Sequence, residues 1–374
     1  MPPATQRRIG RFSQQSEVSH ARAARSPAVF DEEIPPSGTQ AGAHRRPCHR
    51  GCVLLGVPAV AAGPAQPTCF GRPATLTGAG AINGTPADDV IIGSPGEDTI
   101  DGKGGNDRIC GLAGKDLLIG GLGNDRIDAG LGDDIVAGDV RTESGDAGGG
   151  GNDLLILGPG ADAATGDSLA IDGNASGGGR DRIEGGPGDD RIAGDSTSFA
   201  GYATGAGDDT LLAGPGLMDT LTGDGNALLG AHGSGDDFLD LGADGGYFVI
   251  GDHNTFTPGA TANGAGDDRI FGGSAADLLI GDSAADNTSD AGKDRIEGRG
   301  GNDTLFGDNT DVDGTRTVGT AGGRDRLEGG AGDDTLRAGP GDDRLDGGQQ
   351  TDDCDGEAGT GDIAVRCETV VGIP

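Results

Sequence analysis

Single aliphatic residues recur at a fixed interval along most of this chain. Between Gly84 and Ala137, six consecutive nine-residue units fit the pattern G-G-x-G-x-D-x-U-x, in which U is aliphatic. One aliphatic residue between polar neighbours predicts a short strand, because successive side chains of a strand point to opposite faces. The glycine-rich part predicts a sharp turn, because glycine reaches positive-φ conformations. The aliphatic positions are Ile91, Ile100, Ile109, Leu118, Ile127 and Val136.

Two such units predict one coil of about 18 residues that contains two strands and two turns. Coils of this kind stack on one another, and their strands pair in parallel about 4.8 Å apart. The repeat continues, with interruptions, as far as Asp355. We therefore expect an all-β stack of roughly eleven coils that is on the order of 50 Å long.

A longer period, of about 28 residues, appears after Ala137. Each block contains two nonapeptides and a polar insert of about ten residues, such as STSFAGYATG at 196–205, and units without inserts return from Thr320. Each insert begins with Gly-Asp, and this Asp either caps the loop through an Asx-turn or acts as an additional metal ligand; we expect the cap. These residues are Asp139, Asp167, Asp195, Asp224, Asp252, Asp282 and Asp308.

Composition limits what can hold the coils together. The 374 residues include 79 glycines, only 33% are hydrophobic, and the formal net charge is −34. This composition is typical either of a disordered acidic polypeptide or of a protein that binds many cations, and the regular spacing favours the second. The same charge argues against nucleic acid as a partner.

A bound cation would supply the missing stabilisation. Two buried aliphatic side chains per coil cannot offset the backbone entropy lost by a glycine-rich coil, and stacked carboxylates repel one another. Calcium takes six to eight oxygen ligands. A glycine-rich turn offers backbone carbonyls, and the Asp at the sixth position offers a carboxylate. The sequence therefore predicts calcium between successive turns.

Residues 84–355 resemble the RTX family of haemolysin-type calcium-binding nonapeptide repeats. The resemblance implies a right-handed parallel β-roll in which Asp residues of neighbouring coils share each ion. The unit LGADGGYFV has Gly246 in place of the Asp, so we expect a weak or missing site there, and the unit that contains Asp219 is shifted by one residue. The expected calcium ligands are Asp89, Asp98, Asp107, Asp116, Asp125, Asp134, Asp153, Asp162, Asp181, Asp190, Asp209, Asp237, Asp268, Asp277, Asp294, Asp303, Asp325, Asp334, Asp343 and Asp352.

The segment before the repeats has the pattern of a leader. Residues 1–43 are expected to be disordered or to be an extension from a wrongly chosen start codon. Residues 44–62 combine a basic stretch, an apolar run of about 11 residues and a small-x-small motif, which is typical of a secretory signal peptide, although a chance apolar run or a twin-arginine signal are alternatives. The run is too short to span a membrane as a helix. Residues 63–83 and 356–374 are expected to cap the roll, which spans 84–355.

Six cysteines are present, and Cys48 and Cys52 fall in the leader. The other four allow three connectivities. We expect Cys69–Cys110 and Cys354–Cys367, which would staple the two ends of the roll, with free buried thiols as the alternative. A zinc site formed by His44, Cys48, His49 and Cys52 is a weaker interpretation, because no fold is expected around it.

No nucleophile or metalloprotease motif stands out, and His232 and His253 have no convincing catalytic partners. The sequence therefore predicts a secreted, extracellular, non-enzymatic calcium-binding scaffold or adhesive module that folds on binding calcium. Its expected partners are calcium ions and extracellular polysaccharide or cell-surface components. The alternatives are a carbohydrate-active lyase or hydrolase built on the insert-bearing side, and a cytolytic fragment.

Overall fold

The computed structural model describes residues 66–374, and these residues form strands and turns without any helix. No part of this range therefore offers a helix that is long and apolar enough to cross a membrane. The extension expected at 1–43, the leader expected at 44–62 and the alternative zinc cluster lie outside the described residues.

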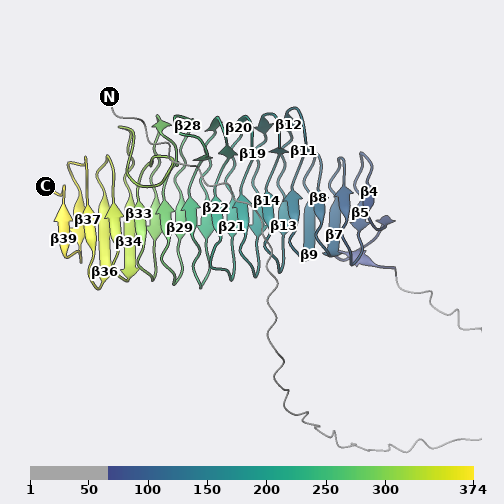
Figure 1. Cartoon of the computed structure of the whole chain (residues 1–374), viewed down its shortest axis with the longest axis horizontal. Coiled ribbons are helices and arrows are strands. Elements are labelled where there is room, and N and C mark those ends of the chain that lie inside the picture. The colour runs from purple at the N-terminus through teal and green to yellow at the C-terminus, as the bar shows by residue number, and fades with distance from the viewer. Residues whose placement is uncertain (1–65) are drawn as a thin grey trace, which may run out of the picture. The chain divides into compact units, whose positions relative to one another are not determined.

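Two long sheets of 13 parallel strands each form the body of the fold (Figure 1). The chain alternates between them, so each coil contributes one strand to each sheet. Sheet 1 consists of β3 (Leu76–Thr77), β5 (Val90–Ile92), β7 (Arg108–Ala113), β9 (Arg126–Leu131), β13 (Leu154–Ile156), β17 (Arg182–Glu184), β21 (Thr210–Leu212), β25 (Phe238–Asp240), β29 (Arg269–Phe271), β32 (Arg295–Glu297), β34 (Arg326–Ala331), β36 (Arg344–Gln349) and β38 (Ile363–Val365). Sheet 2 consists of β4 (Ala81–Asn83), β6 (Thr99–Asp101), β8 (Leu117–Ile119), β10 (Ile135–Ala137), β14 (Ala163–Thr165), β18 (Arg191–Ala193), β22 (Thr220–Thr222), β26 (Phe248–Ile250), β30 (Leu278–Ile280), β33 (Thr304–Phe306), β35 (Thr335–Arg337), β37 (Asp353–Asp355) and β39 (Thr369–Val371).

This arrangement confirms the predicted parallel β-roll. It is longer than the expected eleven coils, because β3, β4, β38 and β39 lie in segments that we expected to be caps and still join the two sheets. With 13 strands per sheet and about 4.8 Å between strands, the stack is about 58 Å long.

The core is a double column of aliphatic side chains between the sheets. One residue of most strands points inward, as in β7, where Ile109 pairs with Ile91 of the preceding coil and Ile127 of the next. These side chains are fully buried and belong to one continuous cluster. The alternation of one buried residue with more exposed neighbours is the pattern that the sequence predicted.

The inserts are not irregular loops. They form two further parallel sheets, which we call the insert lobe and which stack along one side of the roll (Figure 1). Small buried alanines, such as Ala147, Ala170 and Ala175, pack inside this lobe. Its first sheet contains β11 (Arg141–Thr142), β15 (Leu169–Ala170), β19 (Thr197–Ser198), β23 (Asn226–Ala227) and β27 (Asn254–Thr255), and its second contains β12 (Ala147–Gly148), β16 (Ala175–Ser176), β20 (Tyr202–Thr204), β24 (Gly230–His232), β28 (Thr261–Asn263) and β31 (Asn287–Thr288).

The turns of the roll lie along two edges. Turns that lead from sheet 1 to sheet 2 form the plain edge, which carries no inserts. Turns that lead from sheet 2 to sheet 1 form the insert edge, which carries the insert lobe between Gly138 and Asp325. This division separates the predicted ligands into two sets.

Each end of the roll has a disulfide. Cys69, in the antiparallel hairpin of β1 (Thr68–Cys69) and β2 (Arg72–Pro73), is bonded to Cys110 of β7, with 5.9 Å between their Cα atoms. Cys354 of β37 is bonded to Cys367, with a Cα separation of 6.0 Å. The structure therefore has the connectivity that we expected of the four cysteines.

Candidate metal sites

The Asp at the sixth position of each unit lies in a column that runs along its edge. The backbone N–H of Asp89 donates to Oδ1 of Asp107, one coil later, at 2.7 Å, and Asp98 donates to Asp116 in the same way at 2.8 Å. Across an insert the contact is kept, because Asp153 donates to Asp181 at 2.7 Å. The structure thus brings every predicted ligand into one of two columns.

The plain-edge column contains Asp98, Asp116, Asp134, Asp162, Asp190, Asp219, Asp277, Asp303, Asp334 and Asp352. The insert-edge column contains Asp89, Asp107, Asp125, Asp153, Asp181, Asp209, Asp237, Asp268, Asp294, Asp325, Asp343 and Asp362.

The second carboxylate oxygen of most of these residues has no partner. In Asp107, Asp125 and Asp181, for example, Oδ2 is buried without a hydrogen bond, while Oδ1 accepts the backbone N–H of the preceding coil. A buried charged oxygen without a partner is costly. Each column is therefore a row of oxygens that a cation would satisfy.

Glycine at the first position keeps space open beside these oxygens. A methyl group on Gly102 would overlap both Oδ2 of Asp107 and the carbonyl oxygen of Gly120 in the next coil. The space is thus bordered by one carboxylate oxygen and one carbonyl oxygen, which are the donors that calcium takes in proteins. The residues present fit calcium, and an all-oxygen donor set disfavours softer metals.

The electrostatics of the two edges differ. On the plain edge, burial is the largest cause that raises the pKa of Asp162 to about 6 and that of Asp190 to about 7. On the insert edge, burial and then the neighbouring carboxylate of Asp181 raise the pKa of Asp153 to about 10. Both columns contain carboxylates that favour the neutral form, and the largest shifts lie on the insert edge. The edges overlap, because the pKa of Asp107 on the insert edge rises to about 6 and that of Asp303 on the plain edge to about 8.

The Asp of each Gly-Asp pair forms a third column, which we call the insert column. We expected Asx-turns here, and the hydrogen bonds show that this was wrong. Gly266 donates its N–H to Oδ1 of Asp252 at 2.8 Å, and Gly292 donates to Asp282 at 2.7 Å, across 14 and 10 residues. The side chains of Asp252 and Asp282 therefore connect the start of an insert to its end, instead of capping a local turn.

Sequence reasoning missed three members of the columns. Asp219, which the shifted unit left in doubt, takes an ordinary place, because Asp190 donates to its Oδ1 at 2.7 Å. Asp362 accepts from Asp343 at 2.9 Å and ends the insert-edge column. Glu368 accepts from Asp352 at 2.8 Å and ends the plain-edge column. The one-residue displacement of Asp362 from the strict period concealed it, although it follows a glycine and precedes an aliphatic residue.

The unit with Gly246 lacks a carboxylate, as its sequence predicts. Its first position is Leu241, a fully buried leucine, where most units have glycine. Arg299, two coils later, donates through Nη1 to the carbonyl oxygen of Gly272 at 2.9 Å and to that of Gly242 at 3.3 Å. A guanidinium thus faces carbonyls at the turn where the aspartate is missing.

The buried histidine of the insert lobe, His253, has both ring nitrogens engaged by the backbone. Gly225 donates its N–H to Nδ1 at 3.3 Å, and Nε2 lies 3.2 Å from the carbonyl oxygen of Gly233. Burial is the largest cause that lowers its pKa to about 4. These contacts describe a neutral packing residue.

Comparison with known proteins agrees with this geometry. The model of the RTX calcium-binding nonapeptide repeat matches residues 77–109, 111–140, 175–197, 264–287, 288–311 and 320–360. These segments contain turns of both edges and parts of the insert-bearing coils. No curated protein matches the chain significantly. The repeats, the β-roll and the carboxylate columns together place this chain in the family of RTX calcium-binding nonapeptide repeat proteins.

Proposed function

We propose that this protein is a secreted, non-enzymatic scaffold whose roll folds when calcium binds along its two edges. The observation that carries the proposal is the row of buried carboxylate oxygens without partners, such as Oδ2 of Asp107 and Asp125. Calcium, when bound, would supply the positive charge that these oxygens lack. The chain itself supplies the carboxylates, the neighbouring carbonyls and the glycines that leave room for the ion.

Two features support an extracellular location. The described residues hold two disulfides, which are typical of oxidising compartments. A calcium-dependent fold also suits export, because the acidic chain would remain unfolded where calcium is scarce and would fold where calcium is abundant. The signal-like segment at 44–62 is consistent with this route.

The test is a calcium titration of the purified mature protein, followed by far-UV circular dichroism. At pH 9 we expect a coil spectrum in chelator and a strand spectrum with calcium. Magnesium at the same concentration should not substitute, because it requires tighter octahedral geometry. A metal-free protein that keeps its strand spectrum and resists protease at pH 9 would overturn the proposal.

A second function, the binding of a polysaccharide, is favoured by a groove between sheet 2 and the insert lobe. The groove has a volume of about 390 Å³ and is lined mainly by apolar side chains. β10, β14, β18, β22 and β26 supply one wall, and β11, β15, β19, β23 and β27 lie on the other side. Because it crosses five coils, it extends for about 19 Å, which suits a linear polymer.

Aromatic faces mark this groove. Phe199 and Phe256 are stacked with 6.4 Å between ring centroids, and both are about half exposed. Exposed aromatic faces suit the apolar faces of sugar rings. The charged residues that line the groove are Arg141 and Arg191, so binding should be compared between neutral and acidic polymers. Binding to a panel of polysaccharides should decrease in Phe199→Ala and Phe256→Ala but not in Tyr247→Ala, an exposed aromatic outside the groove lining. Turnover of any polysaccharide would instead support an enzyme.

A further inference from the structure

The second residue of a nonapeptide unit differs in backbone conformation and in residue type wherever an insert begins. In most continuous turns this position has a positive φ, as in Gly121 (102°), Gly130 (105°) and Lys103 (79°), although Thr85, Ser94 and Gly273 are exceptions. In the insert-bearing coils the chain leaves the turn at this position, the φ is not positive, and the residue is always Asp. The backbone there no longer requires glycine, but this alone does not explain why the residue is acidic and buried.

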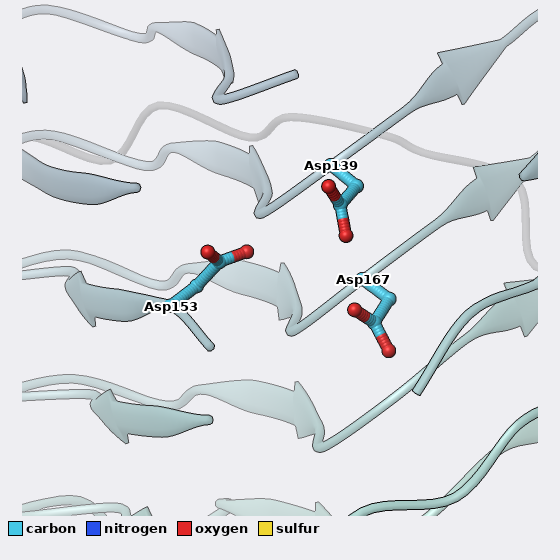
Figure 2. A group of neighbouring side chains, drawn as sticks. All are labelled: Asp139, Asp153 and Asp167. Carbon is cyan, nitrogen blue, oxygen red and sulfur yellow. The ribbon is translucent and has the colours of Figure 1, made fainter. Parts of the chain in front are cut away.

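The Asp residues of the insert column converge on those of the insert-edge column. Carboxylate oxygens of Asp139, Asp153 and Asp167 lie within 4.8 Å of one another, and so do those of Asp167, Asp181 and Asp195. Figure 2 shows Asp153 on one side and Asp139 and Asp167, from two successive coils, on the other. Each group therefore contains residues of two successive coils, and the two groups share Asp167.

Oδ1 of Asp153 and of Asp181 accepts the backbone N–H of the preceding coil, and Oδ1 of Asp167 accepts that of Gly151 at 3.2 Å. The Oδ2 atoms of these three residues have no hydrogen-bond partner. Asp139 and Asp195 are 0% exposed, and neither of their two oxygens has a hydrogen-bond partner. Asp224, two coils from Asp167, has the same exposure and the same two unpartnered oxygens. An unpaired buried carboxylate is costly, and three that face one another are more so. The arrangement occurs twice in succession, and this repetition points to a bound ligand at each of the two groups.

We propose that the insert-bearing coils hold a second kind of calcium site, in which the Asp of the insert column is a ligand together with the Asp of the insert-edge column. In a continuous turn, successive backbone carbonyls lie close together, whereas an insert moves the following carbonyls away from the turn. The carboxylate of the insert column takes the place of those carbonyls as an oxygen ligand. Calcium at these sites connects the insert lobe to the roll. This inference rests on the proposed function, because it assumes that calcium occupies the insert edge.

The test compares variants of the full mature protein by calcium stoichiometry and affinity, measured with equilibrium dialysis and isothermal titration calorimetry. Asp167→Asn removes a carboxylate from both three-residue groups. We expect it to lose the calcium bound at those groups, or to weaken their affinity by at least about tenfold, while the strand spectrum still forms with calcium. Asp172→Asn, which removes an exposed carboxylate from the same insert, is the matched control and should bind as the wild type does.

The outcomes separate the two proposals. If the wild type binds no calcium, the proposed function fails. If the wild type binds calcium and Asp167→Asn binds the same number of ions with the same affinity, only the second kind of site fails, and protons hold the insert column. If Asp167→Asn does not fold, anomalous scattering from wild-type crystals grown with calcium decides: a peak between Asp139, Asp153 and Asp167 supports the site, and peaks confined to the contacts between consecutive sixth-position Asp residues overturn it.

Discussion

The plain edge and the insert edge of this roll are built from the same nonapeptide but have different interiors. On the plain edge, some first positions hold buried aliphatic residues, such as Ala129, Leu157 and Ala213, in place of glycine. On the insert edge, every insert-bearing coil keeps glycine there and adds a second Asp. The plain edge therefore fills part of its turn space with hydrocarbon, whereas the insert edge leaves that space open and surrounds it with oxygen. The point at which the side lobe joins the roll therefore carries more carboxylates than the plain edge does.

The largest expected difference between the edges is their response to pH without calcium. The unfolded pKa of Asp is about 3.9. In the fold, burial raises the pKa of Asp190 on the plain edge to about 7, whereas burial and neighbouring carboxylates raise that of Asp167 in the insert column to about 12. The folded state then binds more protons than the unfolded state, so the free energy of unfolding falls as pH rises above about 4. The fall should end near pH 8 on the plain edge, where burial raises the pKa of Asp303 to about 8, and it should continue at higher pH on the insert edge.

The two tyrosines of the chain can report on the two edges separately. Tyr202 lies in β20 of the insert lobe, and Tyr247 lies in a turn of the plain edge. Tyr247→Phe leaves only Tyr202, so its fluorescence in chelator should report insert-lobe structure that is present at pH 5 and is lost gradually up to pH 9. Tyr202→Phe leaves only Tyr247, and its signal should report a loss of plain-edge structure that is complete at a lower pH. With saturating calcium both signals should stay flat. A metal-free protein that becomes more stable as pH rises would contradict the proposed cause.

Removal of a disulfide should destabilise only the end coils of the roll, which carry no inserts. The loops that they close span 41 and 13 residues, for which chain entropy predicts about 4 and about 3 kcal/mol of stabilisation. Replacing Cys69 and Cys110 by serine should therefore destabilise more than replacing Cys354 and Cys367. Hydrogen exchange in calcium should increase in the end coils and remain unchanged in 138–322. Faster exchange throughout the roll would show that the ends, and not the insert lobe, set its overall stability.

The edges should also differ in their tolerance of alanine at the first position. A methyl group on Gly166 of the insert edge would overlap Oδ2 of Asp181 and the carbonyl oxygen of Gly194. Gly166→Ala should lose calcium affinity and cost about 1–3 kcal/mol. Gly185→Ala on the plain edge should cost less, because Ala213 occupies the equivalent position one coil later. The thermal midpoint at fixed calcium measures both, and equal losses would show that the first position is equivalent on the two edges.

The sequence predicted the repeating parts of this molecule well and its exceptions less well. The period of nine residues places Ile109 in the core and Asp107 in a column, because one strand and one turn fully use the nine positions. The lobe was missed, since its strands are two or three residues long and its core contains alanines such as Ala170 and Ala175, which carry no strong hydrophobic period. The insert column was missed because a Gly-Asp pair alone is compatible with a local cap, and only stacking reveals which carboxylates meet.

The smallest effect concerns the plain-edge turn in which Gly246 replaces the Asp. At this turn Leu241 fills the first position, Gly246 replaces the Asp, and Arg299 reaches back over two coils. The guanidinium pairs with Asp240 at 2.8 Å and lies 4.9 Å from the centre of the Phe271 ring. It therefore neutralises exposed oxygens where no calcium is expected.

Arg299→Gln should accordingly lower stability in saturating calcium by about 1 kcal/mol, because the pair is partly exposed. The number of bound calcium ions should not change, since no ion is expected to depend on this side chain. Arg295→Gln, which breaks an exposed pair with Glu297 on the same coil, is the matched control and should have less effect, because it frees no backbone carbonyl. Thermal unfolding and equilibrium dialysis check both values. If Arg299→Gln binds more calcium than the wild type, the arginine excludes an ion from a competent site, and the plain edge would then resemble the insert edge more closely than its sequence indicates.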